Sequence, residues 1–123
     1  MLRRFFAKKA RPVAAARADE SEQAVLVYLD VTDLPQQVYE NYDLATIEDR
    51  LIEVINANGL GEFDGNEIGP TEAILFMYGP DAELLYQGIE ATLRGYPLCQ
   101  GARVVIRHGG PGAPQREGHI DAA

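Results

Sequence analysis

The segment from Gly61 to Leu85, GEFDGNEIGPTEAILFMYGPDAELL, decides the fold that this sequence predicts. Turn-forming residues at 64–66 and 69–70 predict a short, irregular strand or a bulged hairpin. The apolar run at 73–78 predicts a second, buried strand. The Gly-Pro-Asp sequence at 79–81 predicts that a helix follows, because proline suits the first helical turn and a carboxylate favours its positive end.

Three further elements extend this pattern in both directions. Residues 24–31, AVLVYLDV, form an apolar, β-branched run that is typical of a central strand. A helix begins at Asp43 or Thr46 and ends at Asn58-Gly59, where glycine accepts a left-handed conformation. Residues 102–108, ARVVIRH, predict a last strand. Apolar stripes at helical spacing mark the two helices: Leu44, Ile47, Leu51, Val54 and Ile55 in the first, and Ala82, Leu85, Ile89 and Leu93 in the second.

The predicted order of elements is strand, helix, strand, strand, helix, strand. Right-handed connections place both helices on the same face of the sheet. The sequence therefore predicts an α+β fold, a ferredoxin-like βαββαβ sandwich with a four-stranded antiparallel sheet and two helices on one face. The first and third strands, which are the most apolar, should lie in the middle of the sheet.

The chain of 123 residues is expected to form one domain over residues 24–108, with an extension at each end. Residues 1–23 are interpreted as a basic, flexible arm, because residues 1–18 carry six basic residues and no acidic one. Their apolar residues are too scattered for a secretion signal or a membrane span. Residues 109–123, GGPGAPQREGHIDAA, are rich in glycine and proline and predict a flexible tail.

The chain contains one cysteine, Cys99, so an internal disulfide is excluded. A chain without disulfides fits a reducing compartment, and the predicted location is the cytoplasm. The thiol is predicted to be buried and unreactive, because no basic residue nearer than Arg103 is present to lower its pKa.

Residues 24–108 carry four basic and fourteen acidic residues, a net charge of −10. A domain of this charge repels nucleic-acid phosphates and attracts basic partners, although acidity also serves solubility alone. Several carboxylates gather around the predicted strand-turn-strand segment. We take these as the candidate partner-binding residues: Glu62, Asp64, Glu67 and Glu72.

No motif in the sequence predicts a catalytic site, a cofactor or a metal. Asp64, Asn66 and Gly69 match three positions of a calcium-binding loop, but Ile68 and Leu75 stand where oxygen ligands are required. Nucleotide-binding loops and nucleophile–histidine arrangements are absent. A small enzyme that uses the clustered carboxylates remains an alternative, and it would need one of them to be desolvated.

Nucleic-acid binding is a further alternative, through the basic arm or through the sheet. RNA recognition modules stack bases on aromatic residues of their two central strands, where this chain has Tyr28 and either Phe76 or Tyr78. Arg103 and Arg107 would flank them. The third strand lacks the motif of those modules, and the charge of −10 opposes the hypothesis. An apolar sheet face is also often covered by a second copy, which predicts a homodimer.

Three segments, GEFDGNEIG at 61–69, FMYGPDAELL at 76–85 and GARVVIRHGG at 101–110, carry a family resemblance. The sequence over 59–110 resembles small, largely uncharacterised bacterial proteins with a ferredoxin-like fold, loosely akin to acidic regulators of ribonuclease E. The resemblance implies the same fold and a regulatory role, and it carries over no catalytic residue.

Taken together, these patterns predict a cytoplasmic, non-enzymatic domain that binds another macromolecule. The expected partner is a basic protein, such as a nuclease, or a second copy of the chain. An enzyme using the clustered carboxylates and a nucleic-acid-binding protein are the alternatives.

Overall fold

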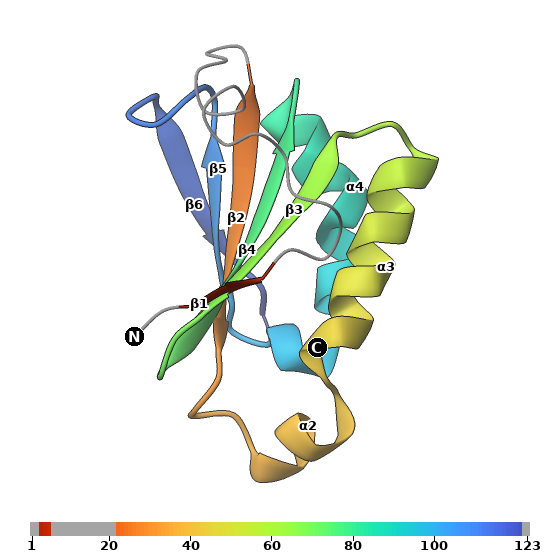
Figure 1. Cartoon of the computed structure of the whole chain (residues 1–123), viewed down its shortest axis with the longest axis vertical. Coiled ribbons are helices and arrows are strands. Elements are labelled where there is room, and N and C mark those ends of the chain that lie inside the picture. The colour runs from red at the N-terminus through yellow and green to blue at the C-terminus, as the bar shows by residue number, and fades with distance from the viewer. Residues whose placement is uncertain (1–2, 6–21, 122–123) are drawn as a thin grey trace.

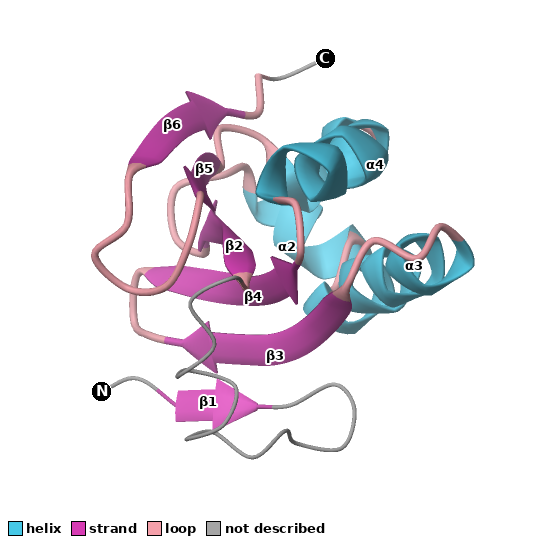
Figure 2. Ribbon diagram, turned by 90° about the horizontal axis from the view of Figure 1, so that it is seen from above, coloured by secondary structure: helices cyan, strands magenta, loops and turns pink. Residues whose placement is uncertain are grey.

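The computed structural model describes residues 3–5 and 22–121 and shows a sheet with helices α3 and α4 packed on one of its faces (Figures 1 and 2). The strands are β1 (Arg3–Phe5), β2 (Gln23–Asp30), β3 (Glu62–Ile68), β4 (Glu72–Gly79), β5 (Arg103–Arg107) and β6 (Gln115–His119). The helices are α2 (Gln36–Asn41), α3 (Leu44–Ala57) and α4 (Ala82–Arg94), with a short 3-10 helix η1 (Pro97–Cys99).

The strands lie in the order β1-β3-β4-β2-β5-β6, and each neighbouring pair is antiparallel. The predicted α+β class and antiparallel sheet are confirmed. The central position of β2 and β4 also agrees with the apolar character of their sequences. The predicted number of four strands is wrong, because β1 and β6 extend the sheet at its two edges.

Strand β6 corrects the prediction of a flexible tail over residues 109–123. Residues 109–114 form a loop that returns the chain to the sheet, where the His108 N–H donates to the Pro114 carbonyl at 2.9 Å. Ile120 then anchors the end of the strand: it is 1% exposed, and its N–H donates to the Ala102 carbonyl at 2.9 Å. One buried isoleucine in a polar segment was too weak a signal to predict this strand.

The predicted arm is described only in part. Arg3–Phe5 forms β1, and Gln23 already belongs to β2. The prediction of flexibility for the intervening residues 6–21 lies outside the described residues. Helix α2 was not predicted, because it has six residues, follows Pro35 and buries only Val38.

Helix α3 begins and ends where local signals predict. Asp43, one of the two predicted starts of α3, is its N-cap and accepts a hydrogen bond from the Thr46 N–H at 3.0 Å. The end of α3 is also confirmed: Gly59 has a φ of 62°, and the Leu60 N–H donates to the Ile55 carbonyl at 3.1 Å.

The core lies between the sheet and the helix pair. In both stripes most of the predicted residues are buried, while Leu44 and Val54 at the edge of α3 are partly buried. Alternate residues of the central strands point into the same core. These core residues are Val25, Val27 and Leu29 of β2, Ala73, Leu75 and Met77 of β4, and Val104 and Ile106 of β5.

Candidate functional site

Three of the four candidate carboxylates lie on the sheet face turned away from α3 and α4, which we call the outer face. In the pairing of β3 with β4, Glu62 stands opposite Tyr78 and Glu67 stands opposite Ile74. Residues directly opposite each other on antiparallel strands lie on the same face of the sheet. Both partners alternate with the core residues of β4 and therefore face outward. Glu72 belongs to the same alternating set.

The fourth candidate, Asp64, is not presented at the surface. The pairing of β3 with β4 shifts between Phe63 and Gly65, so Asp64 is the extra residue of a β-bulge. Gly65 has a φ of 131°, which the bulge requires and which other residues rarely adopt. Asp64 is only 5% exposed. Its position therefore removes it from the set that a partner could contact.

The sheet register adds a carboxylate that the sequence analysis missed. Asp30, at the end of β2, stands directly opposite Glu72. Its carboxylate accepts hydrogen bonds from the N–H groups of Thr32 and Asp33, both at 2.9 Å, and these bonds lower its pKa. Asp30 therefore stays ionised beside Glu72. We call Asp30, Glu62, Glu67 and Glu72 the acidic surface.

The basic strand β1 lies beside this acidic surface. It pairs with the outer edge of β3, and its residue Arg4 stands opposite Glu67 in the register. In Figures 1 and 2, β1 runs along β3 at the edge of the sheet. The structure thus brings a basic segment from the start of the chain to the strand that carries two of the acidic residues.

A hollow of about 300 Å³ lies at the end of the sheet beside Glu72. Its lining includes Asp30, Asp33 and Arg103, so both signs of charge meet there. The Arg103 guanidinium lies 3.9 Å from the centre of the Tyr28 ring. This contact covers an aromatic surface on which a nucleic-acid base would have to stack.

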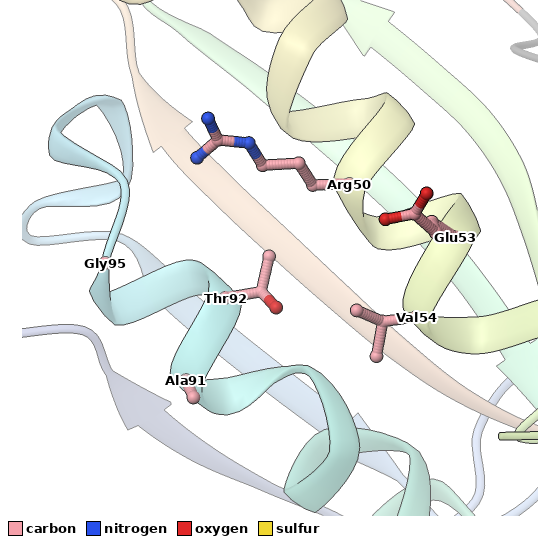
Figure 3. A pocket seen from close by; sticks show the side chains of 6 residues that line it. All are labelled: Arg50, Glu53, Val54, Ala91, Thr92 and Gly95. Carbon is pink, nitrogen blue, oxygen red and sulfur yellow. The ribbon is translucent and has the colours of Figure 1, made fainter. Parts of the chain in front are cut away.

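A second hollow, of about 370 Å³, lies between α3 and α4 (Figure 3). Arg50 and Glu53 are its charged lining residues, and both side chains project from α3 (Figure 3). The Arg50 guanidinium lies 5.2 Å from the centre of the Tyr96 ring. The lining of the hollow holds one hydroxyl, that of Thr92, and one carboxylate, that of Glu53. The other lining residues are Val54, Ala91 and Gly95.

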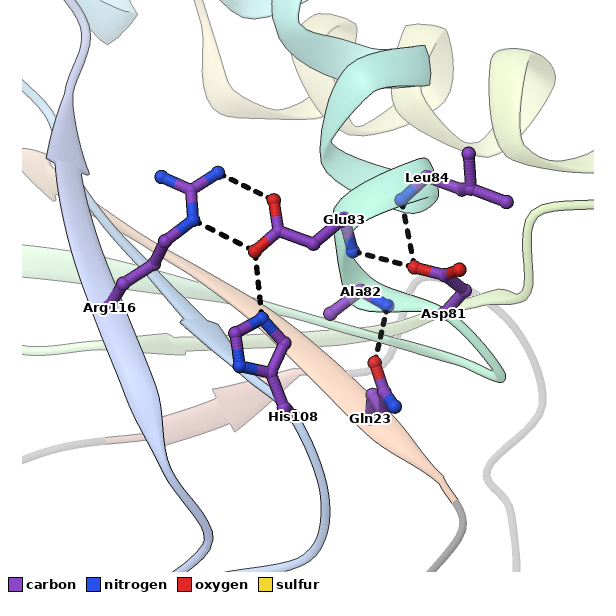
Figure 4. A network of polar contacts seen from close by, with 7 residues as sticks. All are labelled: Gln23, Asp81, Ala82, Glu83, Leu84, His108 and Arg116. Carbon is purple, nitrogen blue, oxygen red and sulfur yellow. Dashed lines mark hydrogen bonds and ion pairs between the residues drawn. The ribbon is translucent and has the colours of Figure 1, made fainter.

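His108 takes part in a polar network that joins α4 to the last two strands (Figure 4). The Glu83 carboxylate accepts hydrogen bonds from Arg116 Nε at 2.8 Å and lies 2.7 Å from His108 Nε2. The Arg116 guanidinium, helped by His108, lowers the pKa of Glu83 to about 2. The network joins β6 to α4. Because its three side chains are exposed, it adds little to the free energy of unfolding.

The start of α4 has a further tie to the sheet. The Gln23 side-chain oxygen accepts a hydrogen bond from the Ala82 N–H at 2.8 Å (Figure 4). Asp81 caps the same helix by accepting from the N–H groups of Glu83 and Leu84. Strands β2, β5 and β6 are thereby all joined to one end of α4.

Cys99 is fully buried, as predicted. Desolvation raises the pKa of its thiol to about 12. The thiol therefore stays protonated at neutral pH and is a packing group rather than a nucleophile.

One polar contact lies inside the core, where the sequence analysis did not predict any. Glu48 of α3 accepts a hydrogen bond from the Asn66 Nδ2 of β3, and the two residues are 9% and 4% exposed. Burial raises the pKa of Glu48, and the hydrogen bond only partly opposes this effect. Among the described residues, no group donates to the buried Asn66 Oδ1. A carboxylate is therefore a poor partner for this amide, which needs a donor as well as an acceptor.

We expect Glu48→Gln to stabilise the protein at neutral pH by about 1 kcal/mol, because glutamine can donate to Asn66 Oδ1. The pKa of Glu48 is higher in the folded than in the unfolded protein. Glu48 therefore stabilises the fold at a pH below its unfolded pKa, and this stabilisation is lost as the pH rises through its folded pKa. The gain should therefore shrink in acid, where Glu48 is protonated. Urea unfolding from pH 4 to pH 8 measures it.

The matched control for this change is Glu53→Gln, which alters an exposed residue of the same helix. It should shift the unfolding free energy by less than about 0.5 kcal/mol. Equal pH profiles for both variants would contradict the account of the Glu48–Asn66 contact.

Comparisons with known proteins do not identify the chain. It matches no protein family, and it has no significant match among curated proteins or solved structures. Within residues 3–5 and 22–121, no helix is long and apolar enough to cross a membrane. In the same part of the chain, no group of three or more His, Cys, Asp or Glu side chains is arranged to hold a metal ion. The resemblance to regulators of ribonuclease E stays a prediction.

Proposed function

We propose that this protein is a ferredoxin-like binding domain of the cytoplasm that acts without catalysis on a basic protein. The acidic surface is its contact region. A nuclease held in check by such a domain is one example of a suitable partner, and it fits the resemblance to ribonuclease E regulators. The proposal rests on the placement of charges on the outer face.

The strand order supports the ferredoxin-like assignment. The four strands that the sequence predicts lie in the order β3-β4-β2-β5. Two strand–helix–strand units, β2-α3-β3 and β4-α4-β5, each skip one antiparallel strand and place their helix on the same sheet face (Figure 2). Strands β1 and β6 are then additions at the edges of this arrangement.

The observation that carries the binding proposal is the pairing of β1 with β3. A basic segment, Arg3–Phe5, lies along the acidic strand with Arg4 opposite Glu67. Electrostatic complementarity of this kind directs association and selects basic partners over acidic ones. The register thus places a basic residue opposite an acidic one, which is the pairing that we propose for the partner.

Charge reversal tests the proposal. Glu62→Lys combined with Glu67→Lys should weaken capture of the partner from the source cell at low salt by about tenfold. Each exposed ion pair contributes about 0.2–1 kcal/mol, and reversal replaces attraction by repulsion. Glu40→Lys combined with Asp49→Lys, which changes the same charge at exposed residues of α2 and α3, is the control. Quantitative pull-down with recombinant bait measures the difference.

The salt dependence adds a second criterion. At ~0.15 M salt the screening length is about 8 Å, so the association rate should fall first as salt is raised. Loss of capture in both double variants would point to net charge rather than to this surface. Undiminished capture by the Glu62→Lys, Glu67→Lys variant would remove the proposal and leave the enzyme as the alternative.

Nucleic-acid binding is the second candidate, and one feature of the outer face favours it. Tyr28 and Phe76 lie on the two central strands, as in RNA recognition modules, and Arg103 and Arg107 lie on the adjoining β5. The contact of Arg103 with Tyr28 and the charge of −10 over residues 24–108 weigh against it. Fluorescence anisotropy with a labelled single-stranded oligonucleotide at the same low salt separates the two candidates.

A second copy of the chain is the other protein partner to consider, since the outer face also carries apolar residues of β2 and β4. Light scattering distinguishes a homodimer from a complex with a different protein.

A further inference from the structure

The pairing of β1 with β3 leads to an inference about how a partner is bound. We infer that the outer edge of β3 is a strand-addition site for an extended basic segment of the partner, and that β1 occupies this site in competition with it. The inference rests on the proposed function, because it specifies how the acidic surface engages its partner.

The geometry of the edge fits strand addition. β3 has seven residues, and β1 pairs antiparallel with the last three of them, Asn66 to Ile68. An edge strand offers its backbone N–H and C=O groups in a row, which is the basis of peptide recognition by strand addition. The contact already exists in the chain, so a backbone that follows β3 is known to be compatible with this edge (Figure 2).

The charges along the edge define which segment fits best. Glu62 and Glu67 lie on the same face of β3, opposite β4 residues that are four positions apart. An extended occupant with one basic residue opposite Glu67 would therefore bring a residue four or five positions later opposite Glu62. The sequence of residues 1–9, MLRRFFAKK, has this spacing, with Arg4 followed by lysine at positions 8 and 9. A basic peptide with such spacing is the expected ligand class.

The short length of β1 makes it a replaceable occupant. Three paired residues form few hydrogen bonds, and the loss of conformational entropy on ordering the chain offsets much of their stabilisation. The advantage of β1 is its attachment to the domain, which corresponds to an effective concentration of roughly 1 mM. A partner segment with a longer match to β3 would displace it, and β1 would exclude weaker basic sequences.

The test uses the full chain and a labelled peptide of residues 1–9, read by fluorescence anisotropy at low salt. Successive backbone N–H groups of a strand point to opposite sides, so one of the two N–H groups at Arg4 and Phe5 faces β3. The double change Arg4→Pro with Phe5→Pro removes both groups and therefore removes the donor that faces β3. Ala15→Pro with Ala16→Pro is the matched control, and circular dichroism confirms that both variants fold. Arg3→Glu with Arg4→Glu weakens β1 by charge without altering the backbone.

We expect the Arg4→Pro, Phe5→Pro variant to bind the peptide about tenfold more tightly than the unaltered chain and the proline control. The Arg3→Glu, Arg4→Glu variant should show a gain in the same direction. A peptide carrying the same two prolines should not bind. Equal affinity for the unaltered chain and the Arg4→Pro, Phe5→Pro variant would refute the competition by β1.

The outcomes separate this inference from the proposed function. If the proline-containing peptide binds as well as the original, contact is made by charge alone: strand addition is wrong and the proposed function survives. If neither peptide binds any variant at low salt, the acidic surface does not take basic segments and the inference fails. The proposed function is then tested separately, by capture of the partner with the Glu62→Lys, Glu67→Lys variant in the pull-down.

Discussion

Replacing Gly61 by alanine should lower the free energy of unfolding by about 3 kcal/mol or more. A Cβ atom at this position would lie 2.0 Å from the Tyr78 carbonyl oxygen and 2.8 Å from the Gly79 Cα, both of them backbone atoms. Gly61 also has a φ of 143°, which side chains disfavour. Overpacking and backbone strain each cost about 1–3 kcal/mol.

The position of Gly61 explains why the effect should be large. It lies just before β3, where that strand begins to pair with the end of β4. A Cβ atom at Gly79 would likewise lie 2.3 Å from the Leu60 carbonyl oxygen. Gly110→Ala is the control, because a Cβ there has nothing within 4 Å. Urea unfolding should separate the two variants clearly. Equal stability would contradict the close approach of the two backbones.

Truncation of Leu51 to alanine should destabilise the domain by about 2–5 kcal/mol, the usual cost of removing a buried leucine side chain. Leu51 is 0% exposed and belongs to the core between α3 and the sheet. The size of the effect depends on how far its neighbours can close the cavity, and their own burial limits that movement. Chemical denaturation at a fixed pH measures the loss.

Leu84→Ala makes the same chemical change on α4, where the leucine side chain is 54% exposed. It should alter stability by less than about 0.5 kcal/mol. A small loss for Leu51→Ala, comparable with that of Leu84→Ala, would mean that the stripe of α3 does not hold the helix on the sheet.

The parts of the fold that were predicted correctly carry local signals. The stripe of α3, the cap at Asp43 and the left-handed Gly59 are each determined by residues within one or two helical turns. The central strands are likewise apolar in sequence, and their inward-facing residues lie in the core.

The missed elements are those whose stability comes from distant parts of the chain. β6 contains the sequence QREGH, four of its five residues are exposed, and it exists because β5 offers an edge and Ile120 reaches the core. β1 has only three residues and depends on pairing with β3. Local propensity cannot predict such strands, since tertiary pairing decides them.

The candidate site could be predicted only in part for the same reason. The bulge that buries Asp64 arises from the register between β3 and β4, and the addition of Asp30 arises from the register between β2 and β4. The Glu48–Asn66 contact also joins residues on separate elements. Sequence spacing identified the acidic character of β3, while the sheet determined which carboxylates face outward.

Amide hydrogen exchange of the unaltered chain, at low salt and with an excess of the peptide of residues 1–9, tests the central claim most directly. The account predicts slower exchange in β3, over Glu62–Ile68, that is lost at high salt and in the Glu62→Lys, Glu67→Lys variant. Unchanged exchange in β3, or protection that appears on α3 and α4 instead, would contradict the claim that the acidic surface is where this protein binds its partner.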